Sequence, residues 1–287
     1  MQDSIVVPDL KPDIAGSHCT CNDNMPYSKA AGMADTEIER LIYEALDYNR
    51  FEVYYQPLYS ICDGKFTEAE ALLRMRGADG KFVPPDKFIP VAEETGLIVD
   101  IGLFVLKKVC GYIKYLQSCH IYISAISVNL SVAQLMRDDA VSRLLQTIKD
   151  SGVSPKHILF EITESVLISN YAKISDKLTE MSESGIRFAL DDFGTGYSNL
   201  TRVISLPFNV IKLDKSLIWD SMENRKCNII IHDLTRTFKN VNLSVTAEGV
   251  ETQEHDDFVR MCGCDKIQGF RYAKPMPVCE AINYFVR

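Results

Sequence analysis

Short apolar runs and longer amphipathic stretches alternate along most of the chain, and this alternation predicts the fold class. Apolar runs rich in β-branched and aromatic residues predict strands at 121–130, 158–162, 186–190, 210–213, 243–247 and 266–270. Apolar residues at helical spacing predict helices over 97–116, 132–150, 171–184, 215–238 and 251–262. Strands that alternate with helices pair in parallel through right-handed crossovers. The pattern therefore predicts an α/β fold built on a parallel sheet.

Two further strands are predicted ahead of this alternating region, at 51–59 and 66–75. Asp63-Gly64 lies between them, and Asp-Gly between two strand patterns is a strong signal for a hairpin. The first two strands should therefore be antiparallel to each other. Eight strands in all suit a closed (β/α)8 barrel of the TIM type, whose first strand runs antiparallel to the rest.

The start of the chain differs from the remainder. Residues 1–34 mix Pro, Asp, Ser, Gly and Asn without periodicity, which predicts a poorly ordered leader or linker. Asp35-Thr36 is a capping signal before apolar residues at helical spacing, so the folded domain should span 35–287. The N-terminus lacks the basic region of a signal peptide, and no apolar run approaches the roughly 20 residues of a membrane span. We therefore expect a cytoplasmic domain without membrane contact.

Composition narrows the classes of function. The formal net charge of −8 argues against general nucleic-acid binding, which needs a basic face. A phosphate substrate would therefore need local neutralisation, which a divalent metal supplies. The nine cysteines are an odd number scattered through apolar runs, as is typical of reduced thiols in a cytoplasmic protein. Pairs such as Cys262 and Cys264 lack a second pair at zinc-site distance.

Polar residues fall late in the predicted strands, with about one residue or pair in each. They are Glu70, Asn129, Glu161, Asp191, Asp192, Lys212, Glu248 and Gln268. In a parallel barrel the strand ends meet at one mouth, where barrel enzymes hold their active sites. We therefore expect these side chains to converge.

Taken singly, each acid is explained equally well as a helix N-cap, a common role for Asp and Asn after a strand. Helix capping does not explain the whole set, because Glu is a poor N-cap and because capping gives no reason for Lys212 or Gln268 to lie within strands. Burying five carboxylates without cations is costly. Oxygen ligands without His or Cys indicate Mg²⁺ or Mn²⁺. Adjacent Asp191 and Asp192 could bridge two ions roughly 3.5–4 Å apart.

Nine short motifs along the chain match one known family. They are 55–57 (YQP), 70–74 (EALLR), 88–94 (FIPVAEE), 127–131 (SVNLS), 161–164 (EITE), 191–198 (DDFGTGYS), 211–214 (IKLD), 247–251 (AEGVE) and 268–270 (QGF). From about residue 38 to 285 the chain resembles the EAL-domain phosphodiesterases, which linearise the bacterial second messenger cyclic di-GMP. The family fold is a barrel with its first strand reversed, in agreement with the hairpin.

The resemblance implies a role for individual residues. One metal would be held by Glu70, Asn129, Glu161 and Asp191, and a second by Asp191, Asp192 and Glu248. Lys212 would contact the attacking water, with Glu251 a further member of the active-site set beside Glu70. Glu164 would steady the loop after Asp192. The substrate-binding residues would be Gln56, Arg74, Asp214 and Gln268.

The activity that the resemblance implies is two-metal hydrolysis of cyclic di-GMP to linear pGpG, with Ca²⁺ inhibiting because it prefers longer bonds and more ligands. Such an enzyme lowers messenger levels in bacterial signalling. The alternative is an inactive EAL module that acts as a cyclic di-GMP receptor or a protein-interaction domain, and a Mg²⁺-dependent barrel enzyme acting on enolates is a more distant one. By resemblance, we also expect a homodimer and a connection to an upstream sensory or GGDEF domain.

Three positions depart from the family pattern: Met75 replaces a tryptophan, Asn199 a serine and Phe270 a tyrosine. None removes a metal ligand. Met75 lacks the flat aromatic surface of tryptophan, so substrate affinity is the property expected to change.

Overall fold

A computed structural model describes residues 36–164, 171–196 and 200–286 of the chain. Its strands are β1 (Phe51–Ser60), β2 (Lys65–Arg76), β3 (Phe82–Val83), β4 (Ala125–Asn129), β5 (Ile158–Thr163), β6 (Arg187–Phe193), β7 (Val210–Leu213), β8 (Ser244–Ala247) and β9 (Lys266–Ile267). Its helices are α2 (Glu37–Asp47), α3 (Pro85–Glu94), α4 (Ile98–Ser118), α5 (Val132–Leu135), α6 (Ala140–Ser151), α7 (Tyr171–Glu183), α8 (Leu200–Ser205), α9 (Lys215–Glu223), α10 (Arg225–Asn240), α11 (Gln253–Met261) and α12 (Val278–Phe285). The predicted leader over 1–34 lies outside the described residues and stays a prediction.

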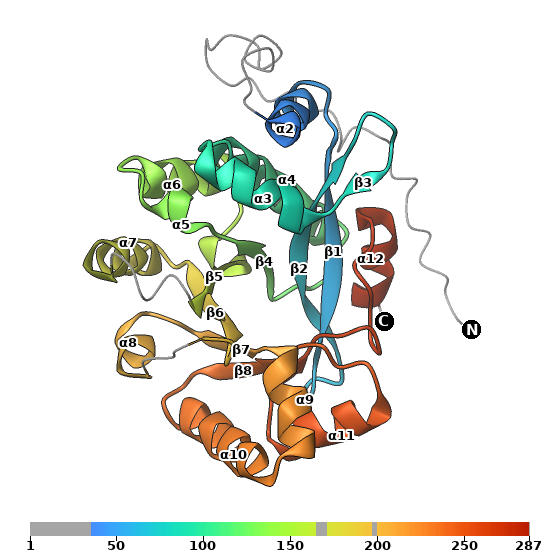
Figure 1. Cartoon of the computed structure of the whole chain (residues 1–287), viewed down its shortest axis with the longest axis vertical. Helices are drawn as coiled ribbons and strands as arrows, with labels where there is room; N and C mark the ends of the chain where they lie inside the picture. The colour runs from blue at the N-terminus through green and yellow to red at the C-terminus, as the bar shows by residue number, and fades with distance from the viewer. Residues whose placement is uncertain (1–35, 165–170, 197–199, 287) are drawn as a thin grey trace.

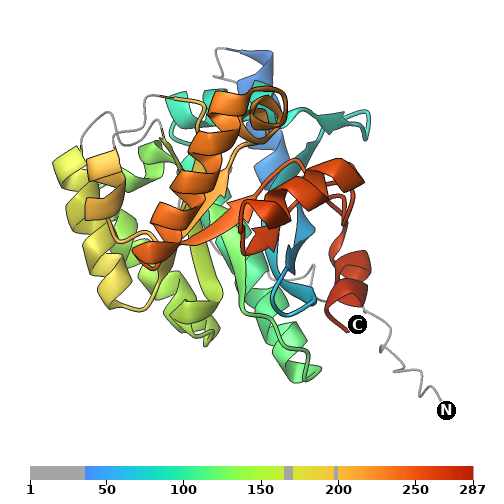
Figure 2. The same ribbon diagram turned by 90° about the horizontal axis from the view of Figure 1, so that it is seen from below.

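The strands close into the predicted barrel. Their order is β1-β9-β8-β7-β6-β5-β4-β2, and β1 pairs with β2 to complete the circle, while β3 is added to the edge of β2. β1 is antiparallel to both of its neighbours, and β4 to β9 are parallel to one another. Figures 1 and 2 show the helices arranged outside the strands. The (β/α)8-type barrel with a reversed first strand is therefore confirmed.

The Asp-Gly hairpin between β1 and β2 is also confirmed, and it positions part of the site. Gly64 adopts a φ of 65°, a left-handed conformation that glycine enters without strain, and its N–H donates to the carbonyl of Ser60 at 3.0 Å. The register places Gln56 directly opposite Glu70. Cross-strand partners project from the same face of a sheet, so the turn brings these two side chains together.

Helix prediction succeeded in the amphipathic stretches and failed where prolines or caps interrupt them. The predicted helix 132–150 is two helices, α5 and α6, and the predicted helix 215–238 is α9 and α10. Asn224 separates the latter pair, because its side chain accepts hydrogen bonds from the N–H groups of Lys226 and Cys227 and so begins a new helix. β3, α3, α8 and α12 were not predicted. α3 begins at Pro85, a position that tolerates proline because its N–H needs no partner.

Two hydrophobic clusters hold the helices on the barrel. The larger one lies between the strands and α4, α6, α7, α10 and α12. The smaller one joins α2, α3 and the start of α4 to the end of β2, and it contains Met75, which is fully buried. Among the described residues, no helix combines the length and the apolar character that a membrane span requires.

Candidate active site

The barrel interior is built in layers, and the alternation of side chains along each strand sets their content. Ala125, Leu159, Ala189 and Val210 form a small apolar cluster contributed by four neighbouring strands. Successive side chains on a strand point to opposite faces, so the residue two positions later points the same way. Two positions beyond Leu159, Ala189 and Val210 are Glu161, Asp191 and Lys212. The polar layer therefore lies directly above the apolar one, toward the carboxyl ends of the strands.

Lys212 lies at the centre of this polar layer, with only 2% of its side chain exposed. Its Nζ is 2.8 Å from Glu248 Oε1, 2.9 Å from Glu161 Oε2, 3.0 Å from Asp191 Oδ1 and 3.5 Å from Glu70 Oε2. These carboxylates come from β2, β5, β6 and the residue after β8. Residues predicted to converge at one mouth thus contact a single ammonium group.

Burial and mutual repulsion perturb the charges of this cluster. Burial lowers the pKa of Lys212, but the four carboxylates around it more than offset this, and its pKa lies well above the usual value. Burial, then the charge of Glu70, raises the pKa of Glu161 well above its usual range. Burial also raises the pKa of Glu248 to about 8. One ammonium group therefore does not neutralise all the carboxylates of this layer. The layer keeps an excess of acidic groups over basic ones.

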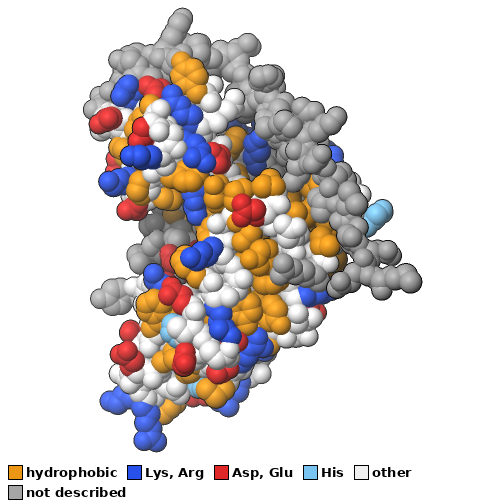
Figure 3. Space-filling model, turned by 90° about the vertical axis from the view of Figure 1, so that its right-hand side faces the viewer, with side chains coloured by type: hydrophobic (Ala, Val, Ile, Leu, Met, Phe, Trp, Pro, Cys, Tyr) orange, Lys and Arg blue, Asp and Glu red, His pale blue; other side chains and the backbone are white. Residues whose placement is uncertain are grey.

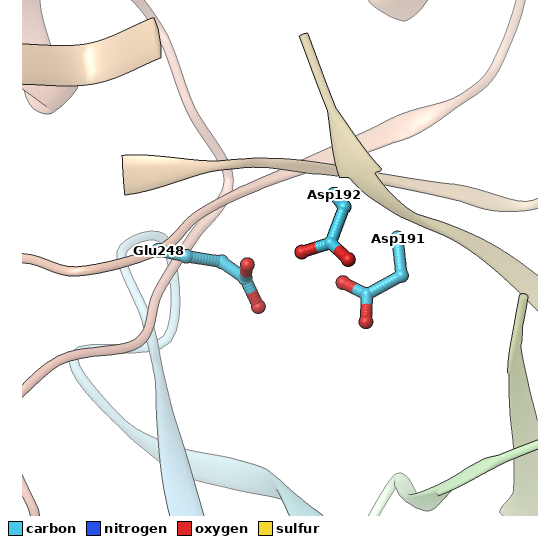
Figure 4. Close-up of side chains that lie close together, drawn as sticks. All are labelled: Asp191, Asp192 and Glu248. Atoms are coloured by element: carbon cyan, nitrogen blue, oxygen red, sulfur yellow. The ribbon is translucent and has the colours of Figure 1, made fainter. Parts of the chain in front are cut away.

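The excess acid is arranged as a cation site would require. Carboxylate oxygens of Asp191, Asp192 and Glu248 lie within 4.8 Å of one another, and Figure 4 shows the three side chains turned toward a common space. Glu161 Oε2 and Asp191 Oδ1 are buried and, although close to Lys212, have no hydrogen bond of acceptable geometry among the described residues. An oxygen-only donor set in which one ammonium group faces four carboxylates fits a hard divalent cation.

Asp192 has an unusual backbone. Its φ is 54°, in the left-handed region that non-glycine residues rarely adopt. Such conformations persist where the surrounding structure holds them, and they concentrate at functional sites. Here the turn aims two consecutive carboxylates, those of Asp191 and Asp192, toward the same space instead of toward opposite faces of β6.

A hydrogen-bonded row of amides supports Glu70 from the barrel interior. Gln268 Nε2 donates to Glu70 Oε2 at 2.5 Å and to Gln56 Oε1 at 3.0 Å, and Gln56 Nε2 donates to the carbonyl of Ala273 at 3.0 Å. Asn129 Nδ2 donates to Glu70 Oε1 at 3.1 Å. The charge of Lys212, and then the bonds from Gln268 and Asn129, offset the effect of burial and hold the pKa of Glu70 below its usual value. The two glutamines predicted to bind substrate thus also fix a predicted metal ligand.

A cleft of about 580 Å³ lies beside the acidic cluster and shares Glu70, Asn129 and Glu161 with it. Arg74 also lines it. The opposite wall is apolar and comes mainly from α3 and the start of α4: Pro85, Ile89, Ile98, Ile101 and Val105. Sequence reasoning assigned no role to this wall; the only signal was the motif at 88–94, which contains Ile89.

Three other predicted residues lie around the cluster. Glu164 is buried, and its Oε2 accepts a hydrogen bond from the N–H of Gly194 at 3.3 Å, so it contacts the loop after Asp192. Asp214 is the N-cap of α9 and accepts from the N–H of Ser216 at 2.8 Å. Glu251 is exposed on the loop after Glu248. The roles of these three residues in catalysis or binding stay predictions.

The departures at Met75 and Phe270 have different settings. Met75 lies in the hydrophobic cluster under α2 and α3 and is not among the residues that line the cleft. Methionine in place of an aromatic residue therefore changes the packing of this cluster. Met75 does not line the cleft, so the structure shows no contact through which it would directly change substrate affinity. Phe270 is 55% exposed, with the ammonium of Lys274 5.4 Å from its ring centre. Asn199 lies outside the described residues.

The fold and the site together define a mostly parallel barrel with an acidic mouth beside a cleft. Comparison with known proteins identifies its family: the EAL domain model matches residues 39–275. The chain is 34% identical over 254 residues to the signaling protein YkoW of Bacillus subtilis, and 30% identical over 253 residues to the cyclic di-GMP phosphodiesterase NbdA of Pseudomonas aeruginosa. Each match covers 88% of this chain and 32% of the relative.

Solved structures agree with this result. The PaMucR phosphodiesterase in complex with c-di-GMP superimposes with a TM-score of 0.80 and 31% sequence identity, over 86% of this chain and 100% of that one. The EAL domain of FimX from Pseudomonas aeruginosa bound to c-di-GMP, at 23% identity and a TM-score of 0.76, shares the fold. This chain belongs to the EAL-domain family. It spans about a third of the length of the curated relatives that it matches.

Proposed function

We propose that this chain hydrolyses cyclic di-GMP to linear pGpG with the help of two divalent cations, and thereby lowers the concentration of the messenger. The observation that carries the proposal is the acidic layer around Lys212, which opens beside a cleft of about 580 Å³. Membership of a family whose relatives include named cyclic di-GMP phosphodiesterases supports the choice of substrate.

The residues present divide naturally between two cation sites. Glu70, Asn129, Glu161 and Asp191 would hold one cation, and Asp191, Asp192 and Glu248 the other. Bound Mg²⁺ or Mn²⁺ supplies positive charge against the phosphodiester and lowers the pKa of a water. Because Lys212 and the acids occupy the same small layer, the ammonium group would lie within reach of that water.

Lys212 orients the attacking water in this proposal. Its pKa is raised by the surrounding carboxylates, so in the metal-free chain it is an ammonium group with hydrogens to donate. Donation to the water oxygen fixes the direction of the lone pair that attacks phosphorus. The attacking water gives up one proton to solvent as its oxygen bonds to phosphorus, the bond from phosphorus to the 3′ oxygen breaks, and the 3′ oxygen takes up a proton from solvent, so that one water is consumed in all.

The cleft residues position the nucleotide. Arg74 lines the cleft, its guanidinium lies 5.6 Å from the ring centre of Tyr54, and a guanidinium pairs well with a phosphate. Gln56 and Gln268 are buried beside Glu70, and Gln268 Oε1, which has no hydrogen-bond partner among the described residues, could accept a hydrogen bond from a base or a ribose. The apolar wall formed by Ile89, Ile98 and Val105 excludes water from the other side.

The proposal is tested by incubating the purified chain with cyclic di-GMP and either Mg²⁺ or Mn²⁺, with separation of substrate and product by liquid chromatography. We expect pGpG to accumulate, a chelator to stop the reaction, and Asp191→Asn to abolish it. Asp257→Asn removes an exposed carboxylate from α11 and should retain the activity. A chain that binds cyclic di-GMP but leaves it intact with both metals would instead be a receptor, and the proposed hydrolysis would be wrong.

A further inference from the structure

Tyr54 lies beside Arg74 on the ribbon formed by β1 and β2. The register places Glu52 directly opposite Arg74, and Tyr54 follows Glu52 by two positions on the same strand. Side chains two positions apart project from the same face of a sheet, and diagonal neighbours are within reach of aromatic and long side chains. Both side chains therefore share the face that carries Gln56 and Glu70.

The contacts of Arg74 hold its guanidinium without neutralising it. The guanidinium lies 5.6 Å from the ring centre of Tyr54, within the roughly 6 Å over which a ring face attracts a cation. Its Nη1 donates to the carbonyl of Leu73 at 2.9 Å. Burial lowers the pKa of Arg74, and the charge of Glu70 offsets part of this effect. Among the described residues, however, no carboxylate lies within ion-pair distance of Arg74.

The carboxylate nearest to Arg74 along the ribbon is engaged by another arginine. Acidic residues outnumber basic ones in the chain, 39 to 31, and on the face shown in Figure 3 the two kinds are interspersed, so carboxylates are not scarce. Arg76, two positions further along β2, donates from both Nε and Nη2 to Glu52. This two-point pairing fixes the orientation of the carboxylate. Glu52, although directly opposite Arg74 in the register, is thereby engaged elsewhere.

Phe82 of β3 contacts both Arg76 and Tyr54. It lies directly opposite Arg76 in the register, and the Arg76 guanidinium is 4.1 Å from its ring centre. Its ring also meets that of Tyr54 edge-on, with 5.6 Å between the ring centres and an angle of 87°, an arrangement that aromatic pairs favour. β3 lies outside the closed circle of strands, on the edge of β2 (Figure 1). One consequence of this added strand is that Tyr54 and Arg76 are both held in place.

An aromatic partner differs from an acidic one in what it leaves free on a guanidinium. A carboxylate would hold the guanidinium firmly, but it would cancel the charge and take up the N–H groups that a phosphate needs. A ring attracts the cation through its quadrupole, and it leaves both the charge and the N–H groups at the edge available. A guanidinium that is already held also loses less freedom when an anion binds.

We propose that Tyr54 is a positioning residue for phosphate binding: its ring holds the guanidinium of Arg74 at the cleft wall. Arg76 assists by engaging the carboxylate of Glu52, which would otherwise compete with the phosphate. The inference rests on the proposed function, in which Arg74 pairs with a phosphate of cyclic di-GMP. Tyr54 acts through Arg74 alone, so the effect of losing its ring should vanish in a chain that lacks Arg74. A residue needed only for folding would weaken binding in both backgrounds.

The test is a calorimetric titration of the full chain with cyclic di-GMP in Ca²⁺, which should fill the metal sites without supporting turnover. We expect Tyr54→Leu to bind about threefold to tenfold more weakly, the loss of one partly buried cation–π contact, and Tyr54→Phe to bind as the parent chain does. In an Arg74→Gln chain, which is itself weakened, Tyr54→Leu should have no further effect. Tyr48→Leu is the matched control, because the Tyr48 ring lies 5.3 Å from the guanidinium of Arg50, is 63% exposed and does not line the cleft. It removes the same kind of contact and should bind as the parent does.

Arg76→Met tests the second half of the arrangement independently. It releases Glu52 to pair with Arg74, so binding should weaken several-fold, and adding Glu52→Gln should restore it. In Mg²⁺, Tyr54→Leu should raise KM and leave kcat nearly unchanged, because the phosphate contact is already made before the reaction. Equal effects of Tyr54→Leu with and without Arg74, or an Arg76→Met defect that Glu52→Gln does not rescue, overturn this inference alone. A parent chain that binds no cyclic di-GMP overturns the proposed function as well.

Discussion

Replacement of Lys212 by methionine tests the electrostatic account of the catalytic layer most directly. The substitution keeps an unbranched side chain and removes the one ammonium group that contacts four carboxylates, at 2.8–3.5 Å. At the effective dielectric constant of about 20 that suits such sites, each contact is worth about 5 kcal/mol gross. Most of this is offset by the cost of taking the ions out of water. The net cost of removing one partner of a buried pair is about 3–5 kcal/mol.

This cost converts into a measurable shift. For a domain of this size about 1 kcal/mol corresponds to roughly 2–4 °C in Tm, so Lys212→Met should lower the Tm of the metal-free chain by roughly 6–20 °C. The carboxylates left without Lys212 can take up protons, which limits the loss of stability. Each unit by which the pKa of such a group rises corresponds to about 1.4 kcal/mol. The assay is thermal unfolding followed by circular dichroism in a chelator. Lys173→Met is the matched control: its Nζ is also 3.0 Å from a carboxylate, Asp138, but both groups are exposed, so we expect no measurable change.

Added metal provides the decisive comparison. Mg²⁺ or Mn²⁺ replaces the missing positive charge, so it should raise the Tm of Lys212→Met more than that of the parent chain. At one hundred times its dissociation constant, a ligand adds about 2.7 kcal/mol. If Lys212→Met is as stable as Lys173→Met in chelator, or if metal raises both Tm values equally, then the acids do not depend on Lys212 and the reasoning fails.

Four further outcomes follow from the structure. Gly102→Ala places a Cβ 1.9 Å from Gln134 Nε2, which breaks the capping box of α5 and should cost about 1–2 kcal/mol in urea unfolding; Gly111→Ala on the same helix meets nothing within 4 Å and should not destabilise. Met75→Ala empties a fully buried site and should cost about 2–5 kcal/mol in the same assay, with no change in KM if Met75 is purely a packing residue. The pKa of Glu248 is raised to about 8 in the folded chain from 4.5, so the stability that this group contributes should fall as pH rises from about 4.5 to 8; a metal-free chain whose Tm rises across that window contradicts this. Ca²⁺ should inhibit turnover in Mg²⁺ competitively, since it prefers longer bonds and more ligands, and equal turnover in Ca²⁺ alone contradicts the proposed sites.

Much of the fold was predictable because each barrel strand is an apolar run of limited length. β7, predicted and observed at Val210–Leu213, is buried throughout. A fully buried parallel strand is recognisable in a sequence as a nearly continuous apolar run. Helices interrupted by local chemistry were less predictable. The break at Asn224 depends on two side-chain hydrogen bonds, and α3 contains Pro85 and Pro90, which sequence rules count against a helix.

The candidate site was predictable to the extent that it follows from the alternation of side chains between the two faces of each strand. Glu161, Asp191 and Lys212 each lie two residues beyond an interior apolar residue, so their convergence follows from alternation alone. What alternation could not supply is contact across the barrel, such as the bond from Gln268 to both Glu70 and Gln56, or the apolar wall of the cleft.

The position of Lys212 also bears on how an acidic mouth can fold before it binds metal. The surrounding carboxylates come from four separate places in the chain, and like charges so close together would drive the strand ends apart. β7 is only four residues long and wholly buried, which leaves the Lys212 backbone little room to move. Its ammonium group can therefore hold Glu70, Glu161, Asp191 and Glu248 near their metal-binding arrangement in the metal-free chain. On this view the residue proposed to orient the water first serves as the internal counterion, which is why its loss should weaken stability and turnover together.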